Sequence, residues 1–203
     1  MKKLFLIDAY ALIFRYYYAF MGRPMRNRAG MNTSIVFGFT KFLRDIQKRE
    51  KPDLLGVAFD PAGGSFRREI YPEYKANRPA TPEDIIASVP YVKRIVEAMC
   101  IPILEVEGYE ADDVIGTLAF KGSEAGYEVY MVTPDKDYGQ LVSETTFIYR
   151  PKYGDKEFDV TPPWNKIDMT EAVIKVTGIP FDKIDSDEEA IEAAKKYGMT
   201  LED

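Results

Sequence analysis

The sequence contains no histidine and only one cysteine among its 203 residues. The lack of histidine excludes Ser-His-Asp and Cys-His catalysis and removes the usual imidazole ligands of zinc. Any metal site must therefore rest mainly on oxygen ligands, which suit magnesium, manganese or calcium. The single cysteine, Cys100, excludes an internal disulfide, and because it lies in the apolar run "EAMCIPIL" we expect it to be buried.

The sequence also lacks an apolar run of about 18 residues, the length that a membrane-spanning helix needs. Its first residues, "MKKLFLIDAY", begin with basic side chains, but the apolar stretch is too short for a signal peptide and is followed by an acid. With 46% hydrophobic and 30% charged residues, the composition is that of an ordinary globular protein. We therefore expect a cytoplasmic protein that does not interact with membranes.

Charge is distributed unevenly along the chain. The net charge is −6, which argues weakly against a nucleic-acid partner. Residues 1–100, however, contain 17 Lys and Arg against 10 Asp and Glu, whereas residues 101–203 contain 10 against 23. A local basic face can bind phosphates even on an acidic protein. One dense basic group consists of Lys41, Arg44, Lys48, Arg49 and Lys51.

Three short apolar stretches, 4–8, 54–60 and 127–135, each end in aspartate, and we interpret them as strands. A fourth candidate strand covers 101–108. The intervening segments have helical patterns and lie at 9–20, 33–50, 81–100 and 114–126. Strands that alternate with helices of this length indicate an α/β fold with a doubly wound, mostly parallel sheet.

In such a sheet the carboxyl ends of the strands meet at one edge, where ligands bind. Acids follow every one of the four predicted strands. Each acid alone could cap a helix and interact with its dipole, but seven crowded carboxylates would repel one another unless a cation neutralised them. The sequence therefore predicts a divalent metal site built from Asp8, Asp60, Glu110, Asp112, Asp113, Asp135 and Asp137.

The segment 61–84, "PAGGSFRREIYPEYKANRPATPED", is a long connection rich in cations and tyrosines. Its "YKANR" stretch could be a solvated basic turn. Because it lies next to the predicted metal site, we favour a phosphate-binding role over a solvated turn. Lys75 and Arg78 would contact the phosphate, and Tyr71 or Tyr74 would stack on a base. Most aromatic rings of helix 9–20 should face the core, but Phe14 and Arg15 could instead hold a nucleotide at the crevice mouth.

Four blocks resemble the 5′ nuclease domain (5′-3′ exonuclease or flap endonuclease) of bacterial DNA polymerase I. They are "LFLIDAYALIFRYYYAF", "VAFDPAGGSFRREIYPEYKANRP", "EGYEADDVIGTLA" and "VTPDKDYGQLV", in the order and spacing of that family. The resemblance covers residues 3–157. It implies a PIN-like core with a helical arch over the active site, which cuts DNA that has a 5′ single-stranded flap or end.

The resemblance also implies roles for individual residues. Two Mg²⁺ or Mn²⁺ ions would drive an in-line displacement at phosphorus that leaves a 5′ phosphate and a 3′ hydroxyl. Asp112 would be a bridging, catalytic ligand, and Lys75 and Arg78 would stabilise the transition state. The implied ligands of the first metal are Asp8, Asp60, Glu110 and Asp112, with Asp113 nearby. The implied ligands of the second metal are Asp135 and Asp137. The implied DNA contacts are Phe14, Arg15, Tyr74, Lys75 and Arg78.

Residues 158–203 depart from the family pattern. They contain neither the "GDxxDN" pair that completes the second metal site nor a helix-hairpin-helix, and they resemble a segment of the lysyl-tRNA synthetase catalytic domain. We therefore expect a catalytic core at 1–157, a short helical appendage at 158–203, and an activity impaired at the second metal. A polymerase domain could belong to the full-length parent. The alternatives are a catalytically defective fragment that binds metal and DNA, and a PIN-type ribonuclease.

Overall fold

A computed structural model describes residues 1–150, 169–180, 183–184 and 186–196 of the chain. The chain forms two compact units, 1–162 and 163–203. The domain boundary that we expected at residues 157 and 158 lies outside the described residues. No helix in the described ranges is long and apolar enough to cross a membrane.

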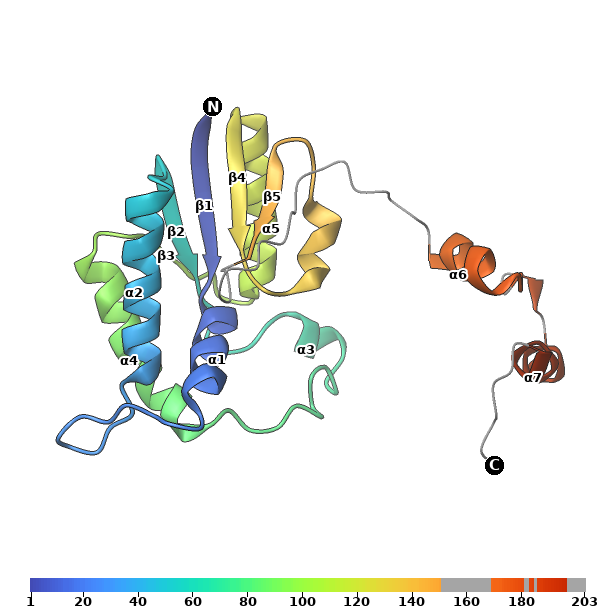
Figure 1. The fold of residues 1–203 in the computed structure, drawn as a ribbon, viewed down its shortest axis with the longest axis horizontal. Helices are drawn as coiled ribbons and strands as arrows, with labels where there is room; N and C mark the ends of the chain where they lie inside the picture. The colour runs from blue at the N-terminus through green and yellow to red at the C-terminus, as the bar shows by residue number, and fades with distance from the viewer. Residues whose placement is uncertain (151–168, 181–182, 185, 197–203) are drawn as a thin grey trace. The chain divides into compact units, whose positions relative to one another are not determined.

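The first unit is built on a five-stranded, all-parallel sheet in the order β3-β2-β1-β4-β5. In Figure 1 the arrows of β1 and β4 accordingly point the same way. The chain reverses its direction of winding between β1 and β4, which places the switch point of the sheet beside Asp8. The strands are β1 (Lys2–Asp8), β2 (Leu54–Ala58), β3 (Ile103–Leu104), β4 (Tyr127–Val132) and β5 (Thr146–Tyr149).

Helices cover both faces of this sheet, as Figure 1 shows. Alternate residues of β1 point to opposite faces: Phe5 and Ile7 pack against helices α1, α2 and α4, whereas Leu6 packs against α5. Gly126, with φ of +81°, follows the end of α5. The helices of this unit are α1 (Ala9–Phe20), α2 (Ser34–Arg49), α3 (Arg67–Ile70), α4 (Glu83–Ala98), α5 (Ala111–Glu124) and the 3₁₀ helix η1 (Lys136–Leu141).

The predicted α/β fold is confirmed, but four details differ. Strand β5 was not predicted, and β3 is only two residues long because it is an edge strand preceded by Pro102, which has no amide to donate. Of the expected helical arch only α3 forms, since glycines and prolines interrupt the connection 61–82. Cys100 is exposed rather than buried, because it lies in the turn after α4 with φ of +55°.

Helices α1 and α2 pack closely at Gly38. A methyl group at Gly38 would overlap the ring of Tyr16, whereas one at Gly22 would meet no atom within 4 Å. We expect Gly38→Ala to destabilise the protein by about 1–3 kcal/mol, because overpacking displaces the ring. Urea unfolding tests this, with Gly22→Ala as the matched control. Equal stability of the two variants would show that Tyr16 moves aside without penalty.

The described residues of the second unit form the helices α6 (Met169–Thr177) and α7 (Asp187–Lys196). Gly178, with φ of +72°, follows α6, and the Ser186 hydroxyl accepts a hydrogen bond from the Glu189 amide at the start of α7. The predicted helical character of the appendage is thus confirmed in the described ranges.

Candidate active site

Three of the predicted acids hold the start of a helix at the carboxyl edge of the sheet. Asp8 ends β1 and accepts a hydrogen bond from the Ala11 amide at 3.0 Å. Asp60, two residues after β2, accepts one from the Ala111 amide, the first of α5, at 2.7 Å. Asp135 accepts one from the Asp137 amide at the start of η1, at 2.9 Å. The capping interpretation of these acids is therefore correct, and the same positions bring their carboxylates to one edge.

Asp8, Asp60 and Asp112 form an acidic group at this edge, which we call the acidic edge. Burial raises the pKa of Asp8 to about 6, and repulsion by Asp60 and Asp112 adds to the effect. Burial also raises the pKa of Asp112, together with repulsion by Asp113 and Glu110. Within the described residues no lysine or arginine forms an ion pair with a member of the acidic edge. The acidic edge thus carries more negative charge than its surroundings compensate.

The hydroxyl of Tyr138, which sequence reasoning missed, is buried beneath the acidic edge. It is the one buried side-chain polar atom in the described part of the chain that lacks a hydrogen-bond partner. Burial raises the pKa of Tyr138, and the charges of Asp8, Asp112, Asp135 and Asp60 raise it further. The phenol therefore remains protonated and can donate a hydrogen bond to a group bound at this edge.

Glu110 and Asp113 face cations of the connection 61–82 instead. Arg67 donates two parallel hydrogen bonds to Asp113, at 2.6 and 2.7 Å, and lies 3.6 Å from Glu110. The bonds from Arg67 lower the pKa of Asp113. Sequence reasoning missed Arg67, because its partner lies 46 residues away and no local pattern links the two.

Lys75 and Tyr74 also bind Glu110. The Lys75 ammonium lies 2.8 Å from Glu110 Oε2 and the Tyr74 hydroxyl 3.2 Å from the same oxygen, while Ser65 donates to Oε1 at 3.0 Å. Burial alone would raise the pKa of Glu110, but the hydrogen bonds from Lys75, Ser65 and Tyr74 outweigh it, so the pKa falls. Glu110 is therefore a fixed carboxylate anchored to the connection.

Lys75 adopts φ of +58°, a left-handed conformation that is uncommon for a residue with a side chain. Burial alone would lower its pKa, but the hydrogen bonds to Glu110 and Tyr74 raise it overall. Arg78 is exposed three residues later, near enough for its charge to act on Lys75. The predicted cationic clamp thus lies beside the acids, with Lys75 engaged by Glu110.

The other predicted residues are more dispersed. Phe14 is partly buried against the core, with its ring stacked on Tyr18 at 6.3 Å, so its position matches the alternative that its ring faces the core. Arg15 lines a hollow between α1 and α2. Asp135 and Asp137 are exposed at the start of η1.

No three Asp, Glu or Cys side chains of the described residues converge closely enough, as they stand, to hold a metal ion. The donor set nevertheless fits a hard divalent cation in its chemistry. All candidate ligands are carboxylate oxygens, the acidic edge has an excess of negative charge, and the Tyr138 hydroxyl beneath it lacks a partner.

Residues 3–175 match the family described as "5'-3' exonuclease, N-terminal resolvase-like domain". A 5'-3' exonuclease of Aquifex aeolicus (strain VF5) is 36% identical over 208 residues, which cover 98% of this chain and 71% of that protein. The chain belongs to the 5'-3' exonuclease family. The expected kinship is confirmed, but it extends beyond residue 157, where we expected it to end, and into α6.

Within this 5'-3' exonuclease family the chain also resembles longer proteins. DNA polymerase I of Synechocystis sp. (strain ATCC 27184 / PCC 6803 / Kazusa) is 37% identical over 185 residues, which cover 90% of this chain but 19% of that protein. The chain thus spans about a fifth of this relative. A solved structure of a bacteriophage T5 flap endonuclease shares 18% identity with a TM-score of 0.57, over 88% of this chain and 62% of that one. This likeness supports the shared fold.

Proposed function

We propose that this chain is a divalent-metal-dependent 5′ nuclease that hydrolyses phosphodiester bonds of DNA at 5′ flaps or ends. The observation that carries the proposal is that the acidic edge, whose members form no ion pair with a described lysine or arginine, lies beside the cationic connection 61–82. Carboxylates suit a metal ion, and neighbouring cations suit a phosphate. A site with both is suited to phosphodiester hydrolysis.

Asp8, Asp60 and Asp112 would hold the cation, with their side chains turned toward a common point. A divalent cation bound there supplies a water of lowered pKa and positive charge beside the reacting phosphate. Asp8 and Asp60 are already held at this edge, because each accepts a backbone amide of a helix start. Tyr138 lies beneath them with a free hydroxyl, which can donate to a water or a phosphate oxygen.

Lys75 and Arg78 would bind the scissile phosphate. In the structure Lys75 forms an ion pair with Glu110, so the substrate phosphate has to take the place of this carboxylate on the ammonium group. Glu110 would then be free to turn toward the cation. Tyr74 contacts the same carboxylate and would move with Lys75, bringing its ring near the bound nucleotide.

The names of the relatives support DNA as the substrate. The Aquifex protein is named a 5'-3' exonuclease, and the T5 flap endonuclease variant was crystallised as a pseudo-enzyme-product complex with DNA and metal ions. The sequence blocks that carry the acidic edge and the cationic connection are those that resemble the 5′ nuclease domain. We propose the same class of substrate for this chain.

A cleavage assay tests the proposal. The protein is incubated with a labelled 5′-flap DNA, a blunt duplex and a single-stranded RNA, each with Mg²⁺, Mn²⁺ or EDTA. We expect cleavage of the flap DNA with either metal and none with EDTA. Binding of flap DNA without cleavage would favour a defective fragment, and cleavage of RNA alone would favour a PIN-type ribonuclease; either result overturns the proposal.

A further inference from the structure

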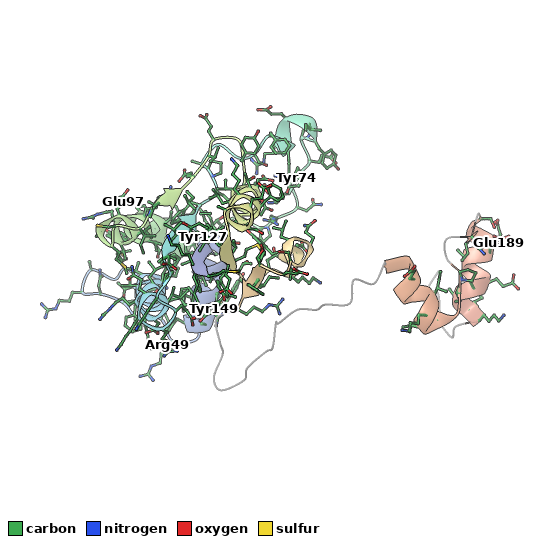
Figure 2. All side chains as sticks on the ribbon, turned by 90° about the horizontal axis from the view of Figure 1, so that it is seen from above. Arg49, Tyr74, Glu97, Tyr127, Tyr149 and Glu189 are labelled. Atoms are coloured by element: carbon green, nitrogen blue, oxygen red, sulfur yellow. The ribbon has the colours of Figure 1, made fainter. Side chains whose placement is uncertain are left out.

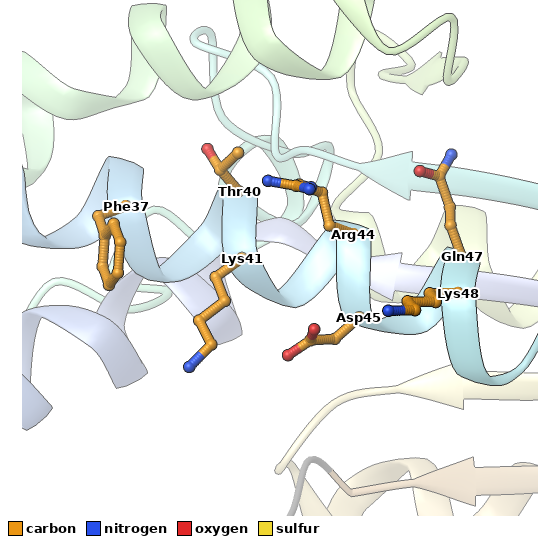
Figure 3. Close-up of a pocket in the computed structure, with 7 residues that line it drawn as sticks. All are labelled: Phe37, Thr40, Lys41, Arg44, Asp45, Gln47 and Lys48. Carbon is orange, nitrogen blue, oxygen red and sulfur yellow. The ribbon is translucent and has the colours of Figure 1, made fainter.

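The outer face of α2 carries a row of exposed cations that the proposed nuclease site does not use. Lys41, Arg44 and Lys48 lie at spacings of three and four residues and are all exposed. They line an open hollow of about 670 Å³ together with Phe37 and Asp45. Figure 3 shows Arg44 projecting from one side of α2 and Lys41 and Lys48 from the other.

A second hollow of about 420 Å³ continues the first toward α1 and β5. The two share Phe37, Lys41 and Asp45, and the second adds Arg15 and Arg49. We call the combined surface the α2 groove. Its cations and its exposed ring are Arg15, Phe37, Lys41, Arg44, Lys48 and Arg49.

The charge of the α2 groove points to an anionic partner. Five cations stand against two acids, Asp45 and Glu50, on a chain whose net charge is −6. Like charges three or four residues apart on a helix repel one another. Among the described residues, no acid forms an ion pair with Lys41, Arg44 or Lys48. An anion that ran between the cations would relieve this repulsion.

The shape and the aromatic content favour an extended polyanion over a single phosphate. Lys41 and Lys48 are seven residues apart, about 10 Å along the helix, and Arg44 projects from the other side of α2 between them. Phe37, at one end of the row, is 52% exposed. A cationic groove with exposed aromatic rings is the pattern by which proteins hold single-stranded nucleic acid, backbone on the cations and bases on the rings.

We infer that the α2 groove is a binding site for single-stranded nucleic acid, separate from the nuclease site. It lies on the face of the sheet covered by α1 and α2, whereas Glu110 and Asp113 belong to α5 and its N-terminal cap on the opposite face. In Figure 2, Arg49 and Tyr149 of the α2 groove lie across the fold from Tyr74 of the connection. A strand held there gives the protein a second contact with its substrate.

The test measures binding in EDTA, so that it does not depend on cleavage. Fluorescence anisotropy with labelled 30-nucleotide oligo-dT is recorded over a series of NaCl concentrations. The triple variant Lys41→Gln, Arg44→Gln, Lys48→Gln should bind at least tenfold more weakly at 0.1 M salt. The slope of log K against log salt should fall by about 2, since each phosphate contact on a single strand contributes about 0.7.

A matched triple variant controls for net charge. Lys2→Gln, Arg94→Gln and Lys121→Gln remove three exposed cations that lie outside the α2 groove, and we expect the parental slope. Phe37→Ala should weaken oligo-dT binding roughly fivefold without changing the slope, because it removes stacking and no charge. Circular dichroism confirms that each variant is folded.

Three results would overturn the inference. The first is an equal loss of binding in both triple variants. The second is that a 30-base-pair duplex or poly-glutamate binds as tightly as oligo-dT and that Phe37→Ala has no effect on binding. This result would indicate that the partner is a duplex or an acidic protein. The third is an unchanged slope in the α2 triple variant. This binding test does not depend on the proposed nuclease activity. A protein that cuts no flap DNA can still show a salt dependence that the α2 triple variant changes.

Discussion

Asp8→Asn is expected to abolish cleavage of flap DNA and, at the same time, to make the metal-free protein more stable at pH 7. The loss of cleavage should reach at least a thousandfold, because Asp8 is one of three carboxylates proposed to hold the cation. The gain in stability follows from burial and repulsion by Asp60 and Asp112, which raise the pKa of Asp8 to about 6. An ionised Asp8 is therefore unfavourable in the folded protein without metal.

The sign of the predicted change in stability follows from the pKa of Asp8. A carboxyl group with a folded-state pKa of about 6 and an ordinary pKa of 3.8 binds its proton more tightly in the folded state. The corresponding stability is fully present below pH 3.8 and is lost as the pH rises through about 6. The shift corresponds to about 3 kcal/mol at pH 7. Asparagine carries no charge but can still accept the Ala11 amide, so the variant should avoid this loss.

Urea unfolding in EDTA between pH 4 and pH 8 measures the effect. The stability difference between Asp8→Asn and the parent should be near zero at pH 4 and should grow through pH 6. Addition of Mg²⁺ should stabilise the parent and leave the variant unchanged. Asp53→Asn is the matched control, since Asp53 is exposed and also accepts a backbone amide. A variant that cuts as well as the parent, or a difference independent of pH, would contradict the assignment of Asp8.

The sequence was sufficient to locate the acids but not to separate their roles. Because the strands are parallel, acids that follow them must come to one edge, and the structure places Asp8 and Asp60 there. From the sequence, helix capping and metal binding were alternative roles for these acids. The two roles do not exclude each other. A carboxylate has two oxygens, and Asp60 uses one for the Ala111 amide.

Long-range contacts account for what was missed. Arg67, Ser65 and Lys75 reach α5 and its cap from an irregular connection, whose path depends on tertiary contacts rather than on periodicity. Strand β5 is four residues long and lies at the sheet edge, so its sequence carries only a short apolar pattern. Tyr138 is buried in a 3₁₀ helix between exposed neighbours, which no local pattern indicates.

Arg67→Met is expected to reduce kcat for flap cleavage by about ten- to a hundredfold while leaving the affinity for Mg²⁺ equal or higher. Arg67 joins the connection to α5 through two hydrogen bonds to Asp113, and the same connection carries Lys75 and Arg78. Without this anchor the phosphate-binding cations are held less firmly beside the acidic edge, and positioning errors of about 1 Å can reduce rates a hundredfold. Glu110 and Asp113 would at the same time lose a compensating charge, which makes the site more attractive to a cation.

Three measurements separate this positioning role from a general loss of structure. Calorimetric Mg²⁺ titration should give an equal or lower Kd for Arg67→Met, and single-turnover cleavage should give the lower rate. Limited trypsin digestion should cut the connection faster in the variant, because one of the contacts that hold it to α5 and its cap is lost. Arg67→Lys should restore part of the rate, since an ammonium group keeps the charge but not the two parallel hydrogen bonds.

Arg68→Met is the matched control, because Arg68 is the exposed neighbour in α3. It should leave kcat, Mg²⁺ affinity and trypsin sensitivity unchanged. If Arg67→Met lost Mg²⁺ binding and activity together, Arg67 would instead support the metal ligands directly, and Asp113 would have to be placed among them. If both variants lost activity equally, the relevant property would be the charge of α3 rather than the Arg67–Asp113 pair. Only a reduced rate with intact metal binding, confined to Arg67, fits an anchor that sets Lys75 and Arg78 against the acidic edge.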